Sequence, residues 1–321
     1  MNKLFATTLV AATVLATGSA IAADAKWPTK PVQAIVPAGA GGDTDFNART
    51  MAKYFEKLTG KPMIVTNVNG ANGAIAMAQI KGGAADGNVL LFGHTGHLVV
   101  GEVSGLTTEN YDSFDVACIP AVDKSATLIS SEQSGLKSVQ DLVNKAKAAP
   151  GTVIYGTEMG GYSHLQGLIL EKKTGIKLKF VDSGTVSTRM TNMLAGRIDL
   201  AANSFGSIQD YVKTGKMNAL AQYNNQANPL IAGVKTFRDQ GFAFDMEKPY
   251  IIAFKKGTDP EIVKAMSDIM KKITEMPEYA KDLEQGFKQP VSFYDTKQAQ
   301  DLLKEIRTDY MQYTDLLRQK K

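Results

Sequence analysis

Residues that form disulfides and metal sites are scarce in this sequence of 321 residues. Cys118 is the only cysteine, so no disulfide can form within the chain, and its apolar neighbours predict a buried strand residue. Only 3 histidines are present, and two of them, His94 and His97, stand three positions apart without a cysteine or a spaced acid. Because zinc needs three or four converging ligands, we expect no metal and no other cofactor.

A strong excess of one charge is also missing. Lysine and arginine total 36 and aspartate and glutamate total 32, and no run of basic residues is longer than two. A formal net charge of +4 is too small for a nucleic-acid-binding surface, so nucleic acid is excluded as a partner. Beyond residue 22, no apolar run approaches the roughly 18 residues of a membrane-spanning helix. These absences predict a soluble protein.

Motifs of common enzyme classes are absent as well. No Gly-x-Ser-x-Gly elbow occurs, and the segment Gly39-Ala-Gly-Gly-Asp-Thr44 lacks the lysine and the spacing of a nucleotide-binding loop. Ser163 is followed by His164, but adjacent residues of a helix point in different directions. We therefore predict a protein that is not an enzyme, with a hydrolase using Ser163 as the alternative.

The first 22 residues have the pattern of an export signal. Lys3 provides the positive charge, residues 4–16 form a short apolar segment, and Ala20-Ile-Ala22 is a small-x-small cleavage site. No cysteine lies at this site, so a lipid anchor is not expected. The sequence predicts cleavage after Ala22 and a mature protein in the periplasm.

The most informative stretch runs from Val32 to Arg49. An apolar strand ends at Pro37, and a loop rich in glycine and alanine leads into a helix. The unpaired N–H groups of a helix N-terminus suit a carboxylate or a phosphate. The candidate ligand-binding residues of this loop are Ala38, Ala40, Gly41, Gly42, Asp43, Thr44 and Asp45. An ordinary strand-to-helix turn is the alternative.

Strand and helix patterns alternate over most of the chain. Residues 32–92 predict three strands with two helices between them, and residues 125–247 repeat the alternation with five further strands. A strand at 250–254, a helix from a capping box at 258–261 and a long helix at 296–318 follow. We expect an α/β fold of two domains, each a mostly parallel five-stranded sheet flanked by helices. The expected boundaries are 23–124 with 248–321 for the first domain and 125–247 for the second.

The second domain has a glycine loop of its own, residues 156–166. Ser163 and Gln166 have the spacing of a capping box, so this helix N-terminus is expected to face the first one across a cleft. Backbone N–H groups of both helices would bind a carboxylate without a buried arginine. This loop and three others supply the remaining candidate ligand-binding residues, namely His94, Thr95, Gly161, Tyr162, Ser163, Thr185 and Asn203.

A series of signatures then resembles one known family. In chain order they are Trp27-Pro-Thr-Lys-Pro-Val32, Gly41-Gly-Asp-Thr-Asp45, Val65-x-Asn67 with Gly70-Ala-x-Gly73, Asp86-Gly-x-x-Leu90, Tyr155-Gly156, Gly161-x-Ser-His-Leu165, Leu194-x-Gly196 and Gly241-Phe242. Their order and spacing are similar to those of the substrate receptors of tripartite tricarboxylate transporters, the Bug proteins. The resemblance covers essentially the whole mature chain.

This resemblance implies a two-domain periplasmic binding protein of the Venus-flytrap kind, type II-like. Such a receptor closes on a small carboxylate, for example a di- or tricarboxylate or an aromatic or hydroxy carboxylate, and delivers it to membrane permease subunits. The expected oligomeric state is a monomer. A receptor for signalling shares every feature of the sequence and remains an alternative. The loops also depart from the family pattern, since relatives often carry an aromatic residue where this chain has Ala38.

Several side-chain roles stay open at this level. Asp43 and Asp45 are expected either to cap a helix in contact with solvent or to bind an ammonium or hydroxyl group of the ligand. A ligand carboxylate near His94 or His164 would favour the imidazolium form. A valine at Gly42 is expected to abolish binding because of its bulk and because of an unfavourable φ.

Overall fold

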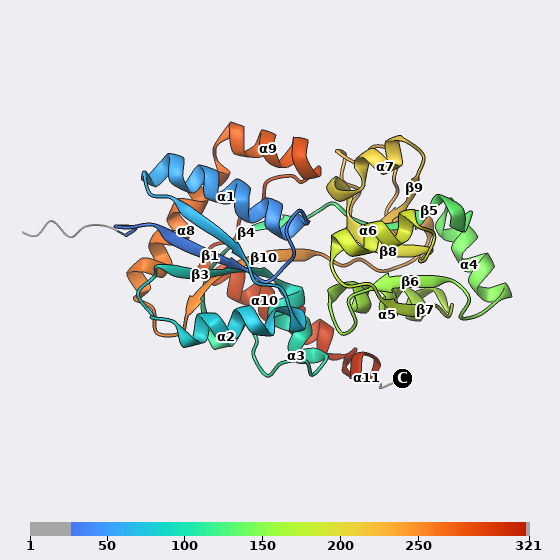
Figure 1. Cartoon of the computed structure of the whole chain (residues 1–321), viewed down its shortest axis with the longest axis horizontal. Coiled ribbons are helices and arrows are strands. Elements are labelled where there is room, and N and C mark those ends of the chain that lie inside the picture. Colours follow the sequence, from blue (N-terminus) through green and yellow to red (C-terminus); the bar gives the residue numbers. More distant parts are fainter. Residues whose placement is uncertain (1–26, 319–321) are drawn as a thin grey trace, which may run out of the picture.

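The computed structural model describes residues 27–318 and contains two separate five-stranded sheets, which form two lobes side by side (Figure 1). The predicted signal peptide, residues 1–22, lies outside the described residues. Within them, no helix is both long enough and apolar enough to cross a membrane.

The first sheet has the strand order β2-β1-β3-β10-β4. Strand β1 is parallel to β2 and β3, whereas β10 is antiparallel to both of its neighbours. The strands are β1 (Val32–Val36), β2 (Met63–Asn67), β3 (Val89–His94), β4 (Phe114–Asp123) and β10 (Lys248–Lys255). Most of their apolar side chains are buried, as the continuous apolar runs of parallel strands predict, whereas Ile64 on the edge strand β2 is exposed.

Helices cover both faces of this sheet. Helices α1, α8 and α9 pack on one face, and α2 and α10 pack on the other (Figure 1). The helices are α1 (Asp43–Thr59), α2 (Ala74–Gly82), α3 (Gly101–Val103), α8 (Pro260–Thr274), α9 (Pro277–Phe287), α10 (Thr296–Met311) and α11 (Thr314–Arg318). A short π-helix, η2 (Gly96–Val100), follows β3.

The second sheet has the strand order β7-β6-β8-β5-β9, in which β5 is antiparallel to β8 and β9. Its strands are β5 (Ala126–Ser131), β6 (Ile154–Thr157), β7 (Lys179–Asp182), β8 (Leu200–Ser204) and β9 (Met217–Gln222). Its helices are α4 (Val139–Ala148), α5 (Tyr162–Thr174), α6 (Val186–Leu194) and α7 (Gln209–Lys213). Two mostly parallel sheets, each with one antiparallel strand, confirm the predicted fold class.

The chain passes between the sheets twice. It crosses from the end of β4 at Asp123 to the start of β5 at Ala126, and it returns into β10 at Lys248. Lys124 and Glu247 form an ion pair between the two crossing segments. Strands β5 to β9 form the second sheet and all other strands form the first, in agreement with domain boundaries near 124 and 248. The exact boundaries stay a prediction.

Four predicted helix termini are wrong. Neither Asp43, Thr44 nor Asp45 caps α1, and Ser163 does not cap α5, because the N-cap residues are Gly42 and Gly161 without side-chain bonds. Helix α8 is capped by Asp259 rather than by a box starting at Thr258. The predicted helix at 296–318 is two helices, since the chain turns after Met311 and the Tyr313 N–H donates to the Tyr310 carbonyl.

Candidate ligand-binding site

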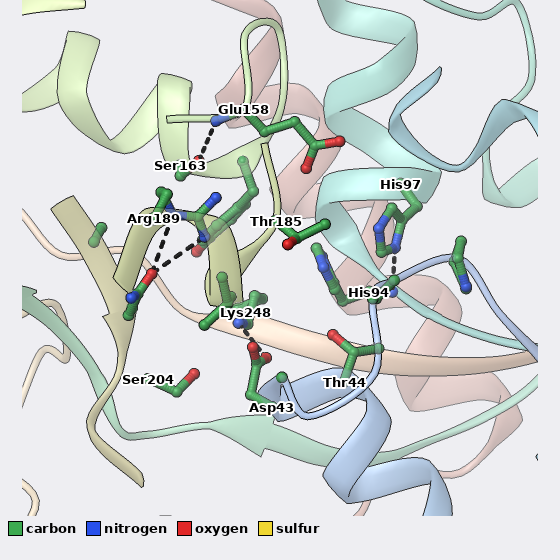
Figure 2. Close-up of a pocket in the computed structure, with 18 of the residues that line it drawn as sticks. Asp43, Thr44, His94, His97, Glu158, Ser163, Thr185, Arg189, Ser204 and Lys248 are labelled. Atoms are coloured by element: carbon green, nitrogen blue, oxygen red, sulfur yellow. Dashed lines mark hydrogen bonds and ion pairs between the residues drawn. The ribbon is translucent and has the colours of Figure 1, made fainter. Parts of the chain in front are cut away.

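A cavity lies between the two domains, with walls from both sheets' loops and from the start of β10 (Figure 2). The cavity has a volume of about 80 Å³. A space of this size suits a small molecule. Nine of the predicted site residues line it, namely Ala38, Gly42, Asp43, Thr44, His94, Tyr162, Ser163, Thr185 and Asn203.

Two helix N-termini at the cavity have no side-chain cap. Gly42 precedes α1 and Gly161 precedes α5, and residues of the first turn of each helix line the cavity. The first N–H groups of a helix have no intrahelical acceptor and lie at the positive end of its dipole. Helix α6 also begins at the cavity, but there the Thr185 hydroxyl accepts a bond from the Thr188 N–H at 3.5 Å. The geometry therefore places two helix N-termini without a side-chain cap at the cavity, an arrangement that suits an anion.

The two domains approach each other closely at the N-terminus of α1. A Cβ atom on Gly39 would lie 3.2 Å from the Thr185 methyl carbon, and one on Gly42 would lie 3.8 Å from the Val186 side chain. Gly42 has an ordinary extended φ of −83°, so the predicted φ penalty at this position is wrong. The residue with a left-handed φ, +79°, is Gly41, which lies outside the cavity wall.

Arg189 is a buried cation of the cavity wall that was not predicted from the sequence. It comes from α6, is 6% exposed and lines the cavity. Its Nε and Nη2 groups donate to the Asn203 side-chain oxygen at 3.2 and 3.1 Å, and Nη1 donates to the Gly184 carbonyl at 2.6 Å. Burial lowers the pKa of Arg189 and the nearby Glu158 opposes that effect, but an arginine remains charged in proteins. The structure thus places a fixed positive charge in the wall.

A buried ionic network forms the part of the wall nearest the crossing strands. The Lys248 ammonium group lies 2.6 Å from the Asp43 carboxylate and 3.0 Å from that of Asp123, and the Tyr250 hydroxyl also donates to Asp43. Burial opposes ionisation of Asp43, but the attraction and hydrogen bonds of Lys248 keep its pKa below the usual value. The interpretation of Asp43 as a helix cap in contact with solvent is therefore wrong, because Asp43 is buried and Gly42 is the N-cap residue.

Asp123 extends this network into the second domain. Its carboxylate accepts bonds from the Ser125 N–H and hydroxyl, both at 2.8 Å, and from the Ser204 hydroxyl. Burial disfavours the Lys248 ammonium, but its two carboxylate partners raise its pKa above the ordinary value. One lysine thus links α1, both crossing strands and β8.

His94 and His97 lie together beside the cavity, with ring centroids 3.9 Å apart. The Nδ1 atom of each accepts a backbone N–H, from Gly96 for His94 and from His94 for His97. Burial and the charge of Lys248 lower the pKa of His97 to about 3, and burial and the other histidine lower that of His94 well below 6.5. Both rings are therefore neutral at pH 7. That a ligand carboxylate near His94 would favour the imidazolium form stays a prediction.

Five predicted site residues do not line the cavity. Ala40 and Gly41 are exposed on the loop, and Thr95 and Gly161 are buried behind the wall. Asp45 accepts bonds from the Gly41 N–H and from the side chains of Arg49 and Asn67. Burial raises its pKa, but these bonds outweigh that effect and lower it. Asp45 therefore holds the loop in shape, and it is not free to bind a ligand.

Ser163 shows no arrangement for nucleophilic catalysis. Its hydroxyl lies 2.8 Å from the Thr157 hydroxyl and accepts the Glu158 N–H at 3.2 Å. His164 does not line the cavity, and its Nδ1 accepts the Gly160 N–H. Across residues 27–318, no group of three or more His, Cys, Asp and Glu side chains is placed to hold a metal ion.

Several cavity residues were not identified from the sequence. They are Asn69, Asn72, His97, Glu158, Gln166, Arg189 and Lys248. Glu158, Gln166 and Arg189 stand in loops or helices that had been singled out, so their polar character there was an available signal. Lys248 lies in a strand that pairs with residues more than 100 positions away, and no local pattern marks it.

Two α/β domains joined by two crossings around an enclosed cavity define the class of the periplasmic binding proteins. Solved structures of that class are similar in fold: R. palustris Rpa4515 with adipate has a TM-score of 0.83 at 20% identity, and the periplasmic binding protein BugD has 0.82 at 22%. Each comparison covers 91% of this chain and 98% of the other. MatC from Rhodopseudomonas palustris with bound malate has a TM-score of 0.77 at 18% identity, over 91% of this chain and all (100%) of that one.

The family model described as tripartite tricarboxylate transporter family receptor, TctC, matches residues 47–320, and the chain belongs to this family. It is 28% identical over 261 residues to the UPF0065 protein in gbd 5'region of Cupriavidus necator, covering 80% of this chain and 79% of that one. It is 26% identical over 241 residues to protein BugT of Bordetella pertussis, covering 74% of each chain. Members of the family are receptors, so the protein is a binding protein and not an enzyme.

Proposed function

We propose that the protein is a periplasmic solute receptor that encloses a small carboxylate between its two domains and delivers it to the permease subunits of a tripartite tricarboxylate transporter. The export signal at residues 1–22 and the family membership support the location and the partner. Adipate and malate occupy two proteins of similar fold. We further propose that the mature protein acts as a monomer of two domains, 23–124 with 248–321 and 125–247.

One observation carries the carboxylate proposal: two uncapped helix N-termini and the buried Arg189 meet at the same enclosed cavity. Backbone N–H groups at the ends of α1 and α5 and the guanidinium group offer charge-assisted hydrogen bonds to a carboxylate. Thr44, Ser163, Thr185 and Asn203 add polar side chains around them. Neutral sugars would leave the guanidinium unmatched, and its desolvation would be uncompensated.

A thermal-shift screen of the mature protein tests this function. A ligand that binds only the folded protein at a hundredfold excess over Kd adds about 2.7 kcal/mol of stability, which raises the midpoint by several degrees. We expect carboxylates to give this shift and the amide or ester of an active compound to lose most of it. A screen in which only sugars, peptides or nucleotides stabilise the protein would overturn the proposal.

The variant Arg189→Gln tests the site. Loss of a charged hydrogen bond costs about 1.5–3 kcal/mol, so the affinity for the carboxylate should fall about tenfold or more. Arg197→Gln, on an exposed arginine after the same helix, is the matched control and should bind as the wild type does. Calorimetry on the folded variants measures the affinity for the carboxylate. If both variants bind it equally well, the carboxylate does not bind at Arg189.

A further inference from the structure

Glu158 is an acidic side chain in the cavity wall without a partner of opposite charge. Among residues 27–318, the charged residues lining the cavity form ion pairs only between Lys248 and its two aspartates. Arg189 interacts with a side-chain amide and a carbonyl, and Glu158 with no cation within ion-pair distance. Within the described residues, the wall therefore presents one cation and one anion that form no ion pair.

The loop between β6 and α5 holds Glu158 in place by its backbone. The Glu158 N–H donates to the Ser163 hydroxyl at 3.2 Å, and its carbonyl accepts the Gly161 N–H at 3.0 Å. Figure 2 shows its side chain leaving this loop on the side away from Ser163. Burial raises the pKa of Glu158, the charge of Arg189 opposes this effect, and that of Asp182 adds to it. The carboxylate is partly removed from water, and the charge of Arg189, which forms no ion pair with it, offsets only part of that cost.

The balance of charge around the cavity limits the ligand. Three acids, Asp43, Asp123 and Glu158, and two bases, Lys248 and Arg189, line or adjoin it. Since Lys248 is already shared by two carboxylates, one ligand carboxylate can be matched by Arg189 and the helix N-termini. A second ligand carboxylate would meet no free cation and would be repelled by Glu158. An ammonium group at Glu158 would instead pair with a charge that is otherwise unmatched.

Building on the function proposed above, we propose that the ligand is an amino carboxylate, whose carboxylate binds at Arg189 and the helix N-termini and whose ammonium group binds to Glu158. Glu158 is then the residue that sets specificity between amino acids and amine-free carboxylates. A site that hydrogen-bonds an amino group of its ligand discriminates strongly against an analogue without that group, because the buried polar group of the site is then left unpaired. Discrimination by the size of the ligand alone is weaker.

Matched ligands test this inference on the mature protein, unfolded and refolded to remove any bound ligand. The probes are the twenty protein amino acids and amine-free counterparts, including alanine with lactate and propionate, and aspartate with malate and succinate. We expect at least one amino acid to bind tenfold or more tightly than both its hydroxy and its amine-free counterparts. If amine-free carboxylates bind as tightly as the amino acids or more tightly, this inference is wrong while the carboxylate function stands. If no carboxylate of either kind binds, the proposed function itself is wrong.

The variant Glu158→Gln tests whether Glu158 causes the preference for amino acids over amine-free carboxylates. Its affinity for the best amino acid should fall tenfold or more, whereas its affinity for the amine-free counterpart should be unchanged or higher, because a repulsive charge is gone. Glu56→Gln, on an exposed face of α1, is the control and should leave both affinities unchanged. Equal loss of affinity for both ligands in Glu158→Gln would show a structural role only and would overturn the assignment.

Discussion

At the scale of the residue, the cavity wall depends on charged side chains that are buried together. Lys248 is 8% exposed and Asp123 is fully buried, so each depends on the other for compensation of its charge. Breaking a buried ion pair by removing one partner costs more than the pair itself contributes, because the remaining charge is left without compensation.

Lys248→Met should therefore lower the free energy of unfolding by about 3–5 kcal/mol, since two carboxylates lose their shared cation. Urea unfolding at pH 7 measures this loss. Lys264→Met is the control: Lys264 pairs with Asp268 on an exposed helix face, so its loss should leave the free energy of unfolding close to the wild-type value. Adding Asp43→Asn and Asp123→Asn to Lys248→Met should restore part of the stability. Equal losses for the two lysine variants would contradict this account of the network.

His97 makes stability depend on pH. Its folded pKa of about 3 lies below the value of about 6.5 in the unfolded chain, so between pH 7 and 5 the unfolded state binds a proton that the folded state does not. Stability should fall as the pH is lowered, by about 2 kcal/mol from this residue over that range. His97→Asn, which keeps a hydrogen-bond acceptor for the His94 N–H, should show a correspondingly smaller fall. Identical pH profiles of unfolding for the two proteins would show that His97 is not held neutral.

At the scale of the element, the cavity depends on how its loops enter their helices. The loop before α1 turns at Gly41, whose φ of +79° is left-handed, and extends at Gly42, whose φ is −83°. Asp45 accepts the Gly41 N–H at 3.0 Å and so holds this turn against the helix. The loop therefore brings the N-terminus of α1 to the cavity without a side-chain cap.

Replacing each of these two glycines by alanine distinguishes the cost of a left-handed φ from the cost of steric contact by the added Cβ atom. Gly41→Ala should cost about 1–2 kcal/mol because of its left-handed φ, although its Cβ would have no atom within 4 Å. Gly42→Ala should change the free energy of unfolding by less than about 0.5 kcal/mol, because its φ suits any residue and its Cβ would make ordinary contacts. Chemical denaturation of both variants measures the difference. A larger cost at Gly42 than at Gly41 would contradict it.

At the scale of the whole molecule, the two domains contact each other around the cavity. The Tyr162 hydroxyl from α5 donates to the Glu247 carbonyl in the returning crossing segment, and the Lys172 ammonium lies over the Tyr313 ring near the C-terminus. Gly39 faces Thr185 across the cavity mouth. Small residues at such positions let the lobes approach closely, and hinge closure around a ligand is a common motion of two-domain binding proteins.

Gly39→Val should hinder this closure, because even its Cβ would lie 3.2 Å from the Thr185 methyl carbon. We expect about tenfold weaker ligand binding or more, with ligand-free stability within about 0.5 kcal/mol of the wild type. Calorimetry gives the affinity, and small-angle scattering with saturating ligand should show a larger radius of gyration.

Thr185→Ser removes the methyl group and keeps the hydroxyl that caps α6, so the double variant should recover most of the affinity. Failure of Thr185→Ser to improve the binding of Gly39→Val would show that this contact does not limit closure.

The sequence by itself determined the order and type of most elements, because apolar runs, glycine turns and amphipathic periods are local properties. Strand β1, the glycine loop after it and the helix that follows were predicted in that order, and the return of the chain into the first sheet at β10 was predicted as well. The loops around Gly42, Tyr162, Thr185 and Asn203 were also placed correctly at one cavity, since the carboxyl ends of parallel strands meet at one edge of a sheet.

Only the tertiary structure decided which charged side chains line that cavity. Asp43 looked like a helix cap, but it pairs with Lys248, 205 positions away, because folding brings β10 beside the N-terminus of α1. Arg189 and Glu158 were both visible in their loops, yet their separation and lack of an ionic partner are properties of the assembled wall. Burial also decided that His94 and His97 are neutral. Such pairings depend on distance and desolvation, which local sequence does not contain.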